Sequence, residues 1–508
     1  MSSKEHLSST DSKPHSSKRG AGFAQAVIWL TLAEIIYNLS GYIVHALTGR
    51  FLGPAEYGRY GLVITLTTMV IVLVGNGIPT AMSKYLSAAS EKDPGTIYGI
   101  RRAAFRIQLI LMGSLTFLFF LAAPLIASLL RDPSLTPLFQ LSSLIIPTFA
   151  AASFNLYFFI GLHFFRVQAF LKTLRSLGRI IFIGGLAFMS GTWGAVTGNI
   201  LAPLIVFLVG LTLEPWLMRR YFPEAHQAKT TASSFPWRDI VSQALPLTLF
   251  LLFYELILTV DLFLVKILLA DDHLTGIYNA AITVGRIPYY LFYALAIALL
   301  PTIAKTEAHR DTEATKKLLS QSFRLMLFLL IPLVVLLARY APETLHLFYG
   351  NAFLEAALPM TILTIGVGCL TVFYVFTFAM NGAGLLRFPL QLSIAGVMLG
   401  LALNLTLIPL YSLIGAALAV TIVSFLLMLG ILIKVFTHFK LSFPWRTVFF
   451  SFLGVLLLWF VSRFLPDGSW FILSSTILGV IYLSFLYLTK ALTPEDLAPF
   501  KKFVKRSA

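Results

Sequence analysis

Charged residues are scarce in this chain of 508 residues: they make up 12% of it, whereas a soluble domain carries about 25%. Hydrophobic residues make up 58%, and the mean hydropathy is +0.85. There is a single cysteine, Cys369, which excludes an intrachain disulfide. The lack of charge excludes a water-soluble fold and predicts an integral membrane protein.

Enzyme motifs are missing as well. The sequence contains no glycine-rich phosphate loop, no His/Cys cluster with metal-ligand spacing and no Asp-x-Asp motif in the first outer loop. We therefore expect no enzyme, bound metal or cofactor, and we interpret the chain as a secondary transporter. An H+ or Na+ gradient or the membrane potential is its expected energy source. The competing hypothesis of a membrane enzyme or structural assembly protein needs catalytic residues on a loop, and the loops supply none.

Basic residues outnumber acidic residues by 38 to 22 and give a formal net charge of +16. Nucleic-acid binding is not expected, because the basic residues are scattered between long apolar runs rather than clustered on one face. A helix needs about 20 apolar residues to cross the hydrocarbon core, and about fourteen runs meet that length. The predicted spans are 24–48, 58–80, 101–126, 137–162, 168–190, 194–217, 242–267, 274–302, 319–340, 355–380, 386–408, 412–435, 447–465 and 469–489.

The positions of the basic residues predict the orientation of these helices. When successive loops are placed on alternate sides of the membrane, 31 of the 38 lysines and arginines fall on the side of the N-terminal tail. Cytoplasmic loops carry the excess of basic residues, so we expect a multi-pass protein of the cell membrane with both termini in the cytoplasm. The outer loops are short, and function is therefore expected inside the helical bundle.

An internal repeat is visible in residues that are rare in membrane helices. One offset of 221 relates Glu34 to Glu255, His45 to Lys266, Gly161 to Gly382, and Gly194-Ala195 to Gly415-Ala416. The segment 57–60, Tyr-Gly-Arg-Tyr, also resembles 275–278, Thr-Gly-Ile-Tyr. Because each unit has an even number of helices, both have the same orientation. We predict an all-α fold with two parallel six-helix lobes around a central cavity, plus two C-terminal helices.

Composition completes the predicted domain organisation. The linker contains Ser-Phe-Pro-Trp-Arg at 234–238, which recurs at 442–446 and suits a short interfacial helix with Trp and Arg at headgroup depth. The predicted units are a disordered cytoplasmic tail (1–22), the N-terminal lobe (23–220), a cytoplasmic linker with an interfacial helix (221–241), the C-terminal lobe (242–440), helices 13 and 14 (441–490) and a basic cytoplasmic tail (491–508).

Charged side chains inside the predicted spans are few, and each needs a partner, a water-filled cavity or a function. Counted inward at about 1.5 Å per residue, Glu34, Glu255 and Arg286 all fall near the bilayer midplane, and we expect them to share one cavity. An alternative for Glu255 and Arg286 is a structural ion pair between adjacent helices, because an unpaired charge would be costly.

Helical spacing adds further candidates. Residues eleven apart lie on nearly the same helix face, so Glu34 is in line with His45, and Glu255 with Lys266. Tyr254 and Asp261, seven residues apart, share the neighbouring face of the predicted span 242–267. Arg59 lies at the outer start of the predicted span 58–80. The predicted cavity residues are Arg286, Glu255, Glu34, Arg59, Asp261 and Tyr254, with His45 and Lys266 in its outer part.

Three segments resemble the polysaccharide-transporter (oligosaccharide flippase) family of the multidrug/oligosaccharidyl-lipid/polysaccharide exporter superfamily. Residues 49–58, Gly-Arg-Phe-Leu-Gly-Pro-Ala-Glu-Tyr-Gly, are similar to its connection between helices 1 and 2. Residues 75–81, Gly-Asn-Gly-Ile-Pro-Thr-Ala, are similar to the end of its helix 2, and residues 278–301 to its helix 8. The predicted plan of six, six and two helices also resembles that of the family and spans residues 23–490, so the resemblance covers nearly the whole chain.

The resemblance implies a V-shaped cavity, alternating access, and transfer of polyprenyl-pyrophosphate-linked oligosaccharide to the outer leaflet for cell-surface polysaccharide biosynthesis. In related lipid II flippases, cationic residues of helices 1, 2 and 8 receive the pyrophosphate. The resemblance implies that Arg286 corresponds to the cationic residue of helix 8, judged by its surrounding sequence, and that Arg59 corresponds to the cationic residue of helix 2. Helix 1 carries Glu34 where a basic residue is expected, which favours a glycolipid other than lipid II. The implied partners are this lipid-linked oligosaccharide, membrane lipids and other polysaccharide-assembly proteins.

A drug/cation antiporter of the same superfamily is the alternative function. Glu34 and Glu255 would suit it as proton or cation sites. Such antiporters usually have twelve helices, so the two additional helices predicted here count against this hypothesis.

Overall fold

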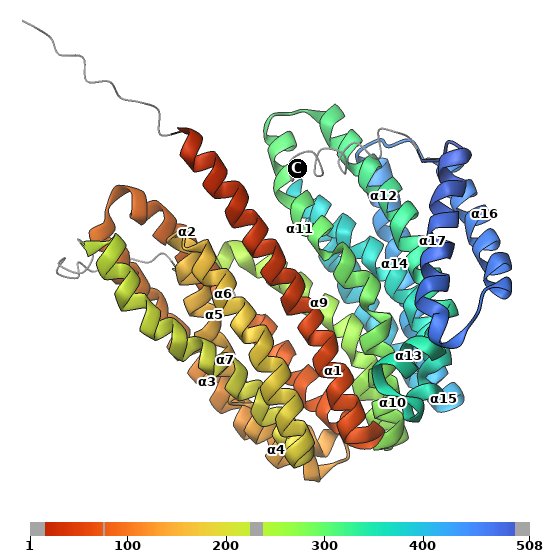
Figure 1. Ribbon diagram of the computed structural model, residues 1–508, viewed down its shortest axis with the longest axis horizontal. Helices are drawn as coiled ribbons and strands as arrows, with labels where there is room; N and C mark the ends of the chain where they lie inside the picture. Colours follow the sequence, from red (N-terminus) through yellow and green to blue (C-terminus); the bar gives the residue numbers. More distant parts are fainter. Residues whose placement is uncertain (1–15, 75–76, 224–236, 493–508) are drawn as a thin grey trace, which may run out of the picture.

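The computed structural model describes residues 16–74, 77–223 and 237–492, and these residues form helices and contain no strand (Figure 1). Ten of the described helical stretches are long and apolar enough to cross a membrane. The described residues therefore confirm the predicted all-α membrane class, while the total of about fourteen spans stays a prediction.

Two helical lobes lie side by side, with α1 along their boundary (Figure 1). The first lobe consists of α1 (Ser16–Val74), α2 (Gly77–Lys92), η1 (Pro94–Thr96), α3 (Ile97–Leu129), η2 (Pro133–Leu135), α4 (Thr136–Ser142), α5 (Ile145–Gly161), α6 (Phe165–Gly178), the π-helical η3 (Arg179–Gly184) and α7 (Gly185–Tyr221). The predicted tail 1–22 overlaps α1, and the remainder of that tail, most of the linker 221–241 and residues 493–508 lie outside the described residues.

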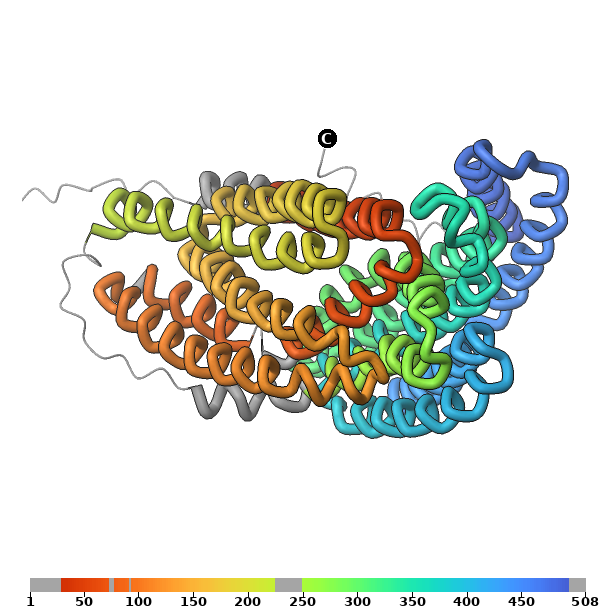
Figure 2. The backbone as a smooth tube through the Cα atoms, turned by 90° about the horizontal axis from the view of Figure 1, so that it is seen from below, coloured from red at the N-terminus to blue at the C-terminus, as the bar shows by residue number. Residues whose placement is uncertain are grey.

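The second lobe repeats this arrangement. It consists of α9 (Trp237–Leu269), α10 (Asp272–Gly285), α11 (Ile287–Ala308), α12 (Thr312–Arg339), α13 (Ala341–Tyr349), η4 (Asn351–Ala356), α14 (Ala357–Gly382) and α15 (Arg387–His438). After it come α16 (Trp445–Val461), η5 (Ser462–Phe464), η6 (Gly468–Trp470) and α17 (Phe471–Leu488). The last two long helices lie at the outer edge of this lobe (Figure 2), where the Tyr482 hydroxyl donates to the Leu327 carbonyl of α12.

Three long helices contain a backbone break: α1 and α15 each cover two predicted spans, and α7 covers the end of one span and the whole of the next. The breaks lie at Gly53 in α1 (φ 70°), at Ser190 and Gly191 in α7 (φ of Gly191 61°), and at Ser412 in α15 (φ 52°). Such positive φ angles end a regular right-handed helix, and glycine adopts them without a Cβ clash. The breaks are where the chain turns from one predicted span to the next.

The lobes pack together at one end and separate toward the other, where α1 begins (Figure 1). A buried apolar cluster joins them at the packed end and includes Tyr57 of the first lobe with Tyr278 and Tyr349 of the second. Two further buried clusters lie within single lobes, one around Phe158 and the other around Phe373. The structure therefore confirms two lobes with separate cores that share an interface.

Candidate functional site

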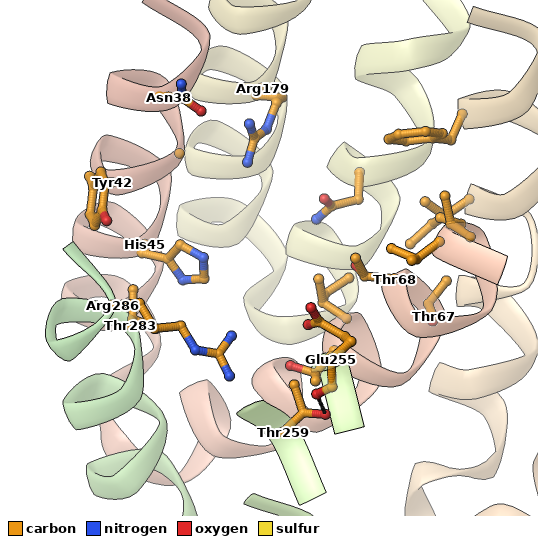
Figure 3. Close-up of a pocket in the computed structure, with 18 of the residues that line it drawn as sticks. Asn38, Tyr42, His45, Thr67, Thr68, Arg179, Glu255, Thr259, Thr283 and Arg286 are labelled. Atoms are coloured by element: carbon orange, nitrogen blue, oxygen red, sulfur yellow. Dashed lines mark hydrogen bonds between the residues drawn. The ribbon is translucent and has the colours of Figure 1, made fainter. Parts of the chain in front are cut away.

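A cavity of about 400 Å³ lies between the lobes (Figure 3). Its walls come from both halves of α1, from α5, α6, η3 and α7 of the first lobe, and from α9, α10 and α11 of the second. Its polar lining consists of Tyr37, Asn38, Tyr42, His45, Thr65, Thr67, Thr68, Arg175, Arg179, Asn199, Glu255, Thr259, Asn279, Thr283, Arg286 and Tyr290. A polar site of this size between two apolar bundles is the strongest candidate for substrate binding among the described residues.

Arg286 lies at the junction between α10 and α11. Pro288 has no backbone N–H, so it cannot donate to the carbonyl four residues earlier, and the helix is interrupted beside the arginine. The Arg286 guanidinium donates to the main-chain carbonyl of Leu258 and points across the cavity toward Glu255 (Figure 3). Among the described ion pairs none joins Glu255 to Arg286, so both charged groups line the cavity with capacity for a further partner.

Arg179 supplies a second guanidinium from the opposite lobe. It is the first residue of the π-helical turn η3, and Figure 3 shows it directed into the cavity, with His45 between it and Arg286. π-Helical turns are rare and frequently occur at functional sites, because the extra residue redirects a side chain. The cavity therefore has a cation on each of its two facing walls.

Two more cations precede Arg179 on α6, at spacings that place Lys172, Arg175 and Arg179 on one helix face. All three lie over the ring of Tyr37, at 5.2, 5.6 and 5.0 Å from its centroid. Arg175 is only 7% exposed and also stacks on Phe149, at 4.1 Å. These contacts fix a cationic stripe along the wall of the first lobe.

The cationic stripe is not among the residues predicted from the sequence, although all three of its residues fall inside the predicted span 168–190. Their spacing of three and four residues, which matches a single helix face, was the available signal. Basic residues near the cytoplasmic boundary of a span also fit the excess of positive charge on that side, so their charge alone does not indicate a cavity. Their role is clear only when the neighbouring Tyr37 is placed against them.

The structure separates the predicted site residues into four groups. Arg286, Glu255 and His45 line the cavity. Glu34 forms an ion pair with Lys172, and its side chain is 52% exposed, so it neutralises the first cation of the stripe. Asp261 and Tyr254 do not line the cavity, because each is packed inside the second lobe: Asp261 accepts from the Tyr278 hydroxyl at 2.7 Å, and Tyr254 contacts Tyr374.

Arg59 and Lys266 lie instead at the packed end of the lobes. Arg59 binds Glu56 at 3.1 Å and donates to the Ser134 hydroxyl at 2.6 Å. Lys266 forms ion pairs with Asp272 of its own lobe and with Asp132 of the other lobe, the latter at 3.3 Å. Lys266 therefore contributes to the contact between lobes, whereas the contacts of Arg59 lie within the first lobe. Neither residue lines the cavity.

Asp132 connects the two lobes electrostatically. Partial burial raises its pKa, but hydrogen bonds from Ser134 and Lys266 and the charges of Lys266 and Arg59 outweigh that effect and hold the pKa below its ordinary value of 3.8. The carboxylate is therefore charged at neutral pH, and its contact with Lys266 is a true ion pair.

Hydrogen bonds that involve no carboxylate close the same end of the molecule. The Tyr57 hydroxyl lies 2.9 Å from Nδ1 of His45 and 3.0 Å from the Tyr349 hydroxyl of the other lobe. Arg50 donates to the main-chain carbonyls of Leu347 and Phe348, at 2.7 and 3.1 Å. The cavity is therefore sealed from the packed end, which the predicted topology places on the outer side.

Comparisons with known proteins agree with this architecture. A family model described as "Polysaccharide biosynthesis protein" matches residues 23–307, more than half of the chain. The lipid II flippase MurJ of Bacillus subtilis (strain 168) is 24% identical over 420 residues, which cover 76% of this chain and 76% of that protein.

Two solved structures share the fold. The lipid II flippase MurJ in an inward closed conformation superposes with a TM-score of 0.67 at 16% identity, covering 91% of this chain and 98% of that one. A multidrug resistance MATE family transporter of the MOP superfamily, in an inward-facing conformation, superposes with a TM-score of 0.68 at 15% identity, covering 82% and 99%. The chain thus belongs to the family described as polysaccharide biosynthesis proteins, and it shares the fold of these two solved structures.

Proposed function

We propose that this protein is a flippase that moves a polyprenyl-pyrophosphate-linked oligosaccharide from the cytoplasmic to the outer leaflet of the cell membrane. The observation that carries the proposal is the charge of the cavity: Arg175, Arg179 and Arg286 line it with a single carboxylate, Glu255. Unbalanced cations at membrane depth are costly, and a bound anion removes that cost. A pyrophosphate held between Arg179 and Arg286 would receive bidentate hydrogen bonds from both lobes.

The position of these arginines suits alternating access. Because Arg179 belongs to the first lobe and Arg286 to the second, an anion between them couples substrate binding to the relative position of the lobes. The sealed end corresponds to one of the two states, in which substrate enters from the cytoplasm. Opening that end while the other end closes would release the substrate outward.

A substrate other than lipid II is part of this proposal. Helix α1 contributes no arginine or lysine to the cavity lining, and Glu34 of this helix is an acid that pairs with Lys172. The cations of the first lobe come instead from α6 and η3. A different placement of cations favours a different head group around the same pyrophosphate.

Transport in reconstituted vesicles tests the proposal directly. The purified protein is expected to move a fluorescent polyprenyl-pyrophosphate oligosaccharide between leaflets, and polyprenyl pyrophosphate should compete with it, whereas polyprenyl alcohol should not. Vesicles without protein set the background rate. Gradient-coupled efflux of small organic cations, with no movement of the glycolipid, would instead identify a drug/cation antiporter and overturn the proposal.

The ion pair between Asp132 and Lys266 gives a prediction about the sealed end. The Asp132→Asn substitution removes one charge contact between the lobes, while Lys266 keeps Asp272 as a partner. Such a contact contributes about 1 kcal/mol, so the sealed state should lose about fivefold in population. A cysteine in place of Thr283, in a Cys369→Ser background, should react faster with an impermeant maleimide from the outer side.

The Asp467→Asn substitution is the matched control for this measurement. Asp467 also forms an ion pair, with Arg339 at 2.9 Å, but both residues belong to the part of the chain that follows the first lobe. Its labelling rate should equal that of the unsubstituted protein. Equal acceleration by the two substitutions would show that the Asp132 contact does not hold the lobes together.

A further inference from the structure

We infer that Tyr290 and Tyr293 form a stacking surface for the sugar rings next to the pyrophosphate, and we call these two residues the tyrosine platform. The inference rests on the proposed function and deepens it, because it assigns the glycan part of the substrate to its own subsite. Arginines recognise only the anionic group, so a second kind of side chain must distinguish one head group from another.

The platform lies on the same helix face as Arg286. Tyr290 and Tyr293 follow Arg286 by four and seven residues, and at 100° per residue all three fall within about 60° of one another. At about 1.5 Å per residue, the tyrosines lie roughly 6 and 10.5 Å further along α11. This direction leads away from the sealed end, so a glycan attached to a pyrophosphate at Arg286 would extend over both rings.

The two rings are exposed although they sit among buried aromatic residues. Tyr290 is 46% exposed and lines the cavity, and Tyr293 is 40% exposed. The tyrosines behind them, Tyr254 and Tyr374, are 2% and 1% exposed. Packing of the second lobe therefore accounts for the buried pair but leaves ring surface of the platform free for a ligand.

Neighbouring rings hold the platform in place. Tyr289 lies 5.1 Å from Tyr290 and 6.1 Å from Tyr293, and Tyr293 stacks on Tyr374 at 6.0 Å with an interplanar angle of 20°. On the other side, Tyr42 of α1 meets Tyr290 edge to face, at 6.1 Å and 90°. A surface fixed in this way loses little side-chain entropy when a ligand binds.

The chemistry of the surroundings favours a sugar over a cation. Aromatic faces bind cationic amines, but Arg286 and Arg179 would repel an amine bound beside them. A pyranose ring is neutral and has one face of C–H bonds that packs on an aromatic ring, while its hydroxyl groups remain free to bond with water or tyrosine hydroxyls. Lipid-linked sugars are therefore the ligand class that fits both the rings and the adjacent charge.

Two ligands that differ only in the glycan test this inference. Binding to the purified full-length protein in nanodiscs is measured for polyprenyl pyrophosphate and for the same lipid carrying a trisaccharide. The Tyr290→Leu/Tyr293→Leu variant should bind the trisaccharide lipid about tenfold more weakly and the bare pyrophosphate lipid within twofold of the unsubstituted protein. Phenylalanine at both positions should retain most of the affinity for the trisaccharide lipid, because it keeps the rings.

The control variant is Tyr487→Leu, which removes a tyrosine that is 58% exposed on α17, outside the cavity lining. It should bind both lipids normally, and thermal unfolding should show that all variants fold. Equal losses for the two lipids, or no loss for either, would overturn the platform, while binding of the bare pyrophosphate lipid by the unsubstituted protein would still support the pyrophosphate site. Failure of the unsubstituted protein to bind either lipid would instead refute the proposed function.

Discussion

Alanine at Arg286 is expected to abolish transport of a pyrophosphate-linked substrate and to weaken its binding at least tenfold. Hydrogen bonds between charged groups contribute about 1.5 to 3 kcal/mol, which corresponds to a factor of roughly 10 to 150 in affinity. The substitution also leaves Glu255 with one cation fewer in the cavity, which makes the potential at the pyrophosphate position less favourable. Arg179→Ala should have an effect of similar size, since the second guanidinium comes from the opposite lobe.

Further substitutions distinguish the contribution of the positive charge at Arg286 from that of the guanidinium shape. Arg286→Lys keeps the charge but not the planar fork, so it should restore part of the binding. Arg463→Ala is the matched control, because Arg463 stacks on Trp459 at 3.7 Å and does not line the cavity. The measurements are equilibrium binding of polyprenyl pyrophosphate and flipping in vesicles. Full transport by Arg179→Ala/Arg286→Ala would rule out the proposed pyrophosphate site.

Several features of the fold were predictable because they depend on composition and period. Scarce charge and long apolar runs fix the class of protein, and the repeat of rare residues fixes two parallel lobes. The repeat also related the segment 57–60 to 275–278, and the structure brings Gly58 and Gly276 of these segments into direct contact. Equivalent positions of two parallel units meet where the units face each other.

The site was predictable only in part. Helical spacing shows which residues share a face, but it does not show whether that face lines a cavity or packs against a neighbouring helix. Depth and spacing singled out Arg286, Glu255 and His45, and all three line the cavity. Asp261 has the same kind of spacing, but the Tyr278 hydroxyl on the next helix donates a hydrogen bond to it, and both side chains are buried inside the lobe. The breaks at Gly191 and Ser412, by contrast, fall at the boundaries that hydropathy placed between predicted spans, 190–194 and 408–412.

The two glycines at the packed end lead to the second prediction of large effect. A Cβ atom added to Gly276 would lie 1.7 Å from the carbonyl oxygen of Pro54, and one added to Gly58 would lie 2.6 Å from the carbonyl oxygen of Asp272. The obstructing atoms are backbone and cannot rotate away. The second half of α1 and α10 therefore approach each other more closely here than any residue with a side chain allows.

Gly276→Ala is accordingly expected to force the lobes apart at the sealed end and to stop transport. Overpacking costs typically about 1 to 3 kcal/mol, which would lower the population of the sealed state by a factor of roughly 5 to 150. The cysteine at position 283 should then react with impermeant maleimide from the outer side without added substrate. Gly58→Ala should act in the same direction but less strongly, because its nearest contact is 2.6 Å instead of 1.7 Å.

Gly479→Ala in α17 is the matched control, because a Cβ at that position meets no atom within 4 Å and alanine is the better helix former. This variant should be sealed, stable and active. Since the clash at Gly276 exists only while the sealed end is closed, the Gly276→Ala variant should still fold and still bind substrate offered from the open outer side. A Gly276→Ala protein that stays unlabelled and transports normally would mean that closure of this end does not require contact between α1 and α10.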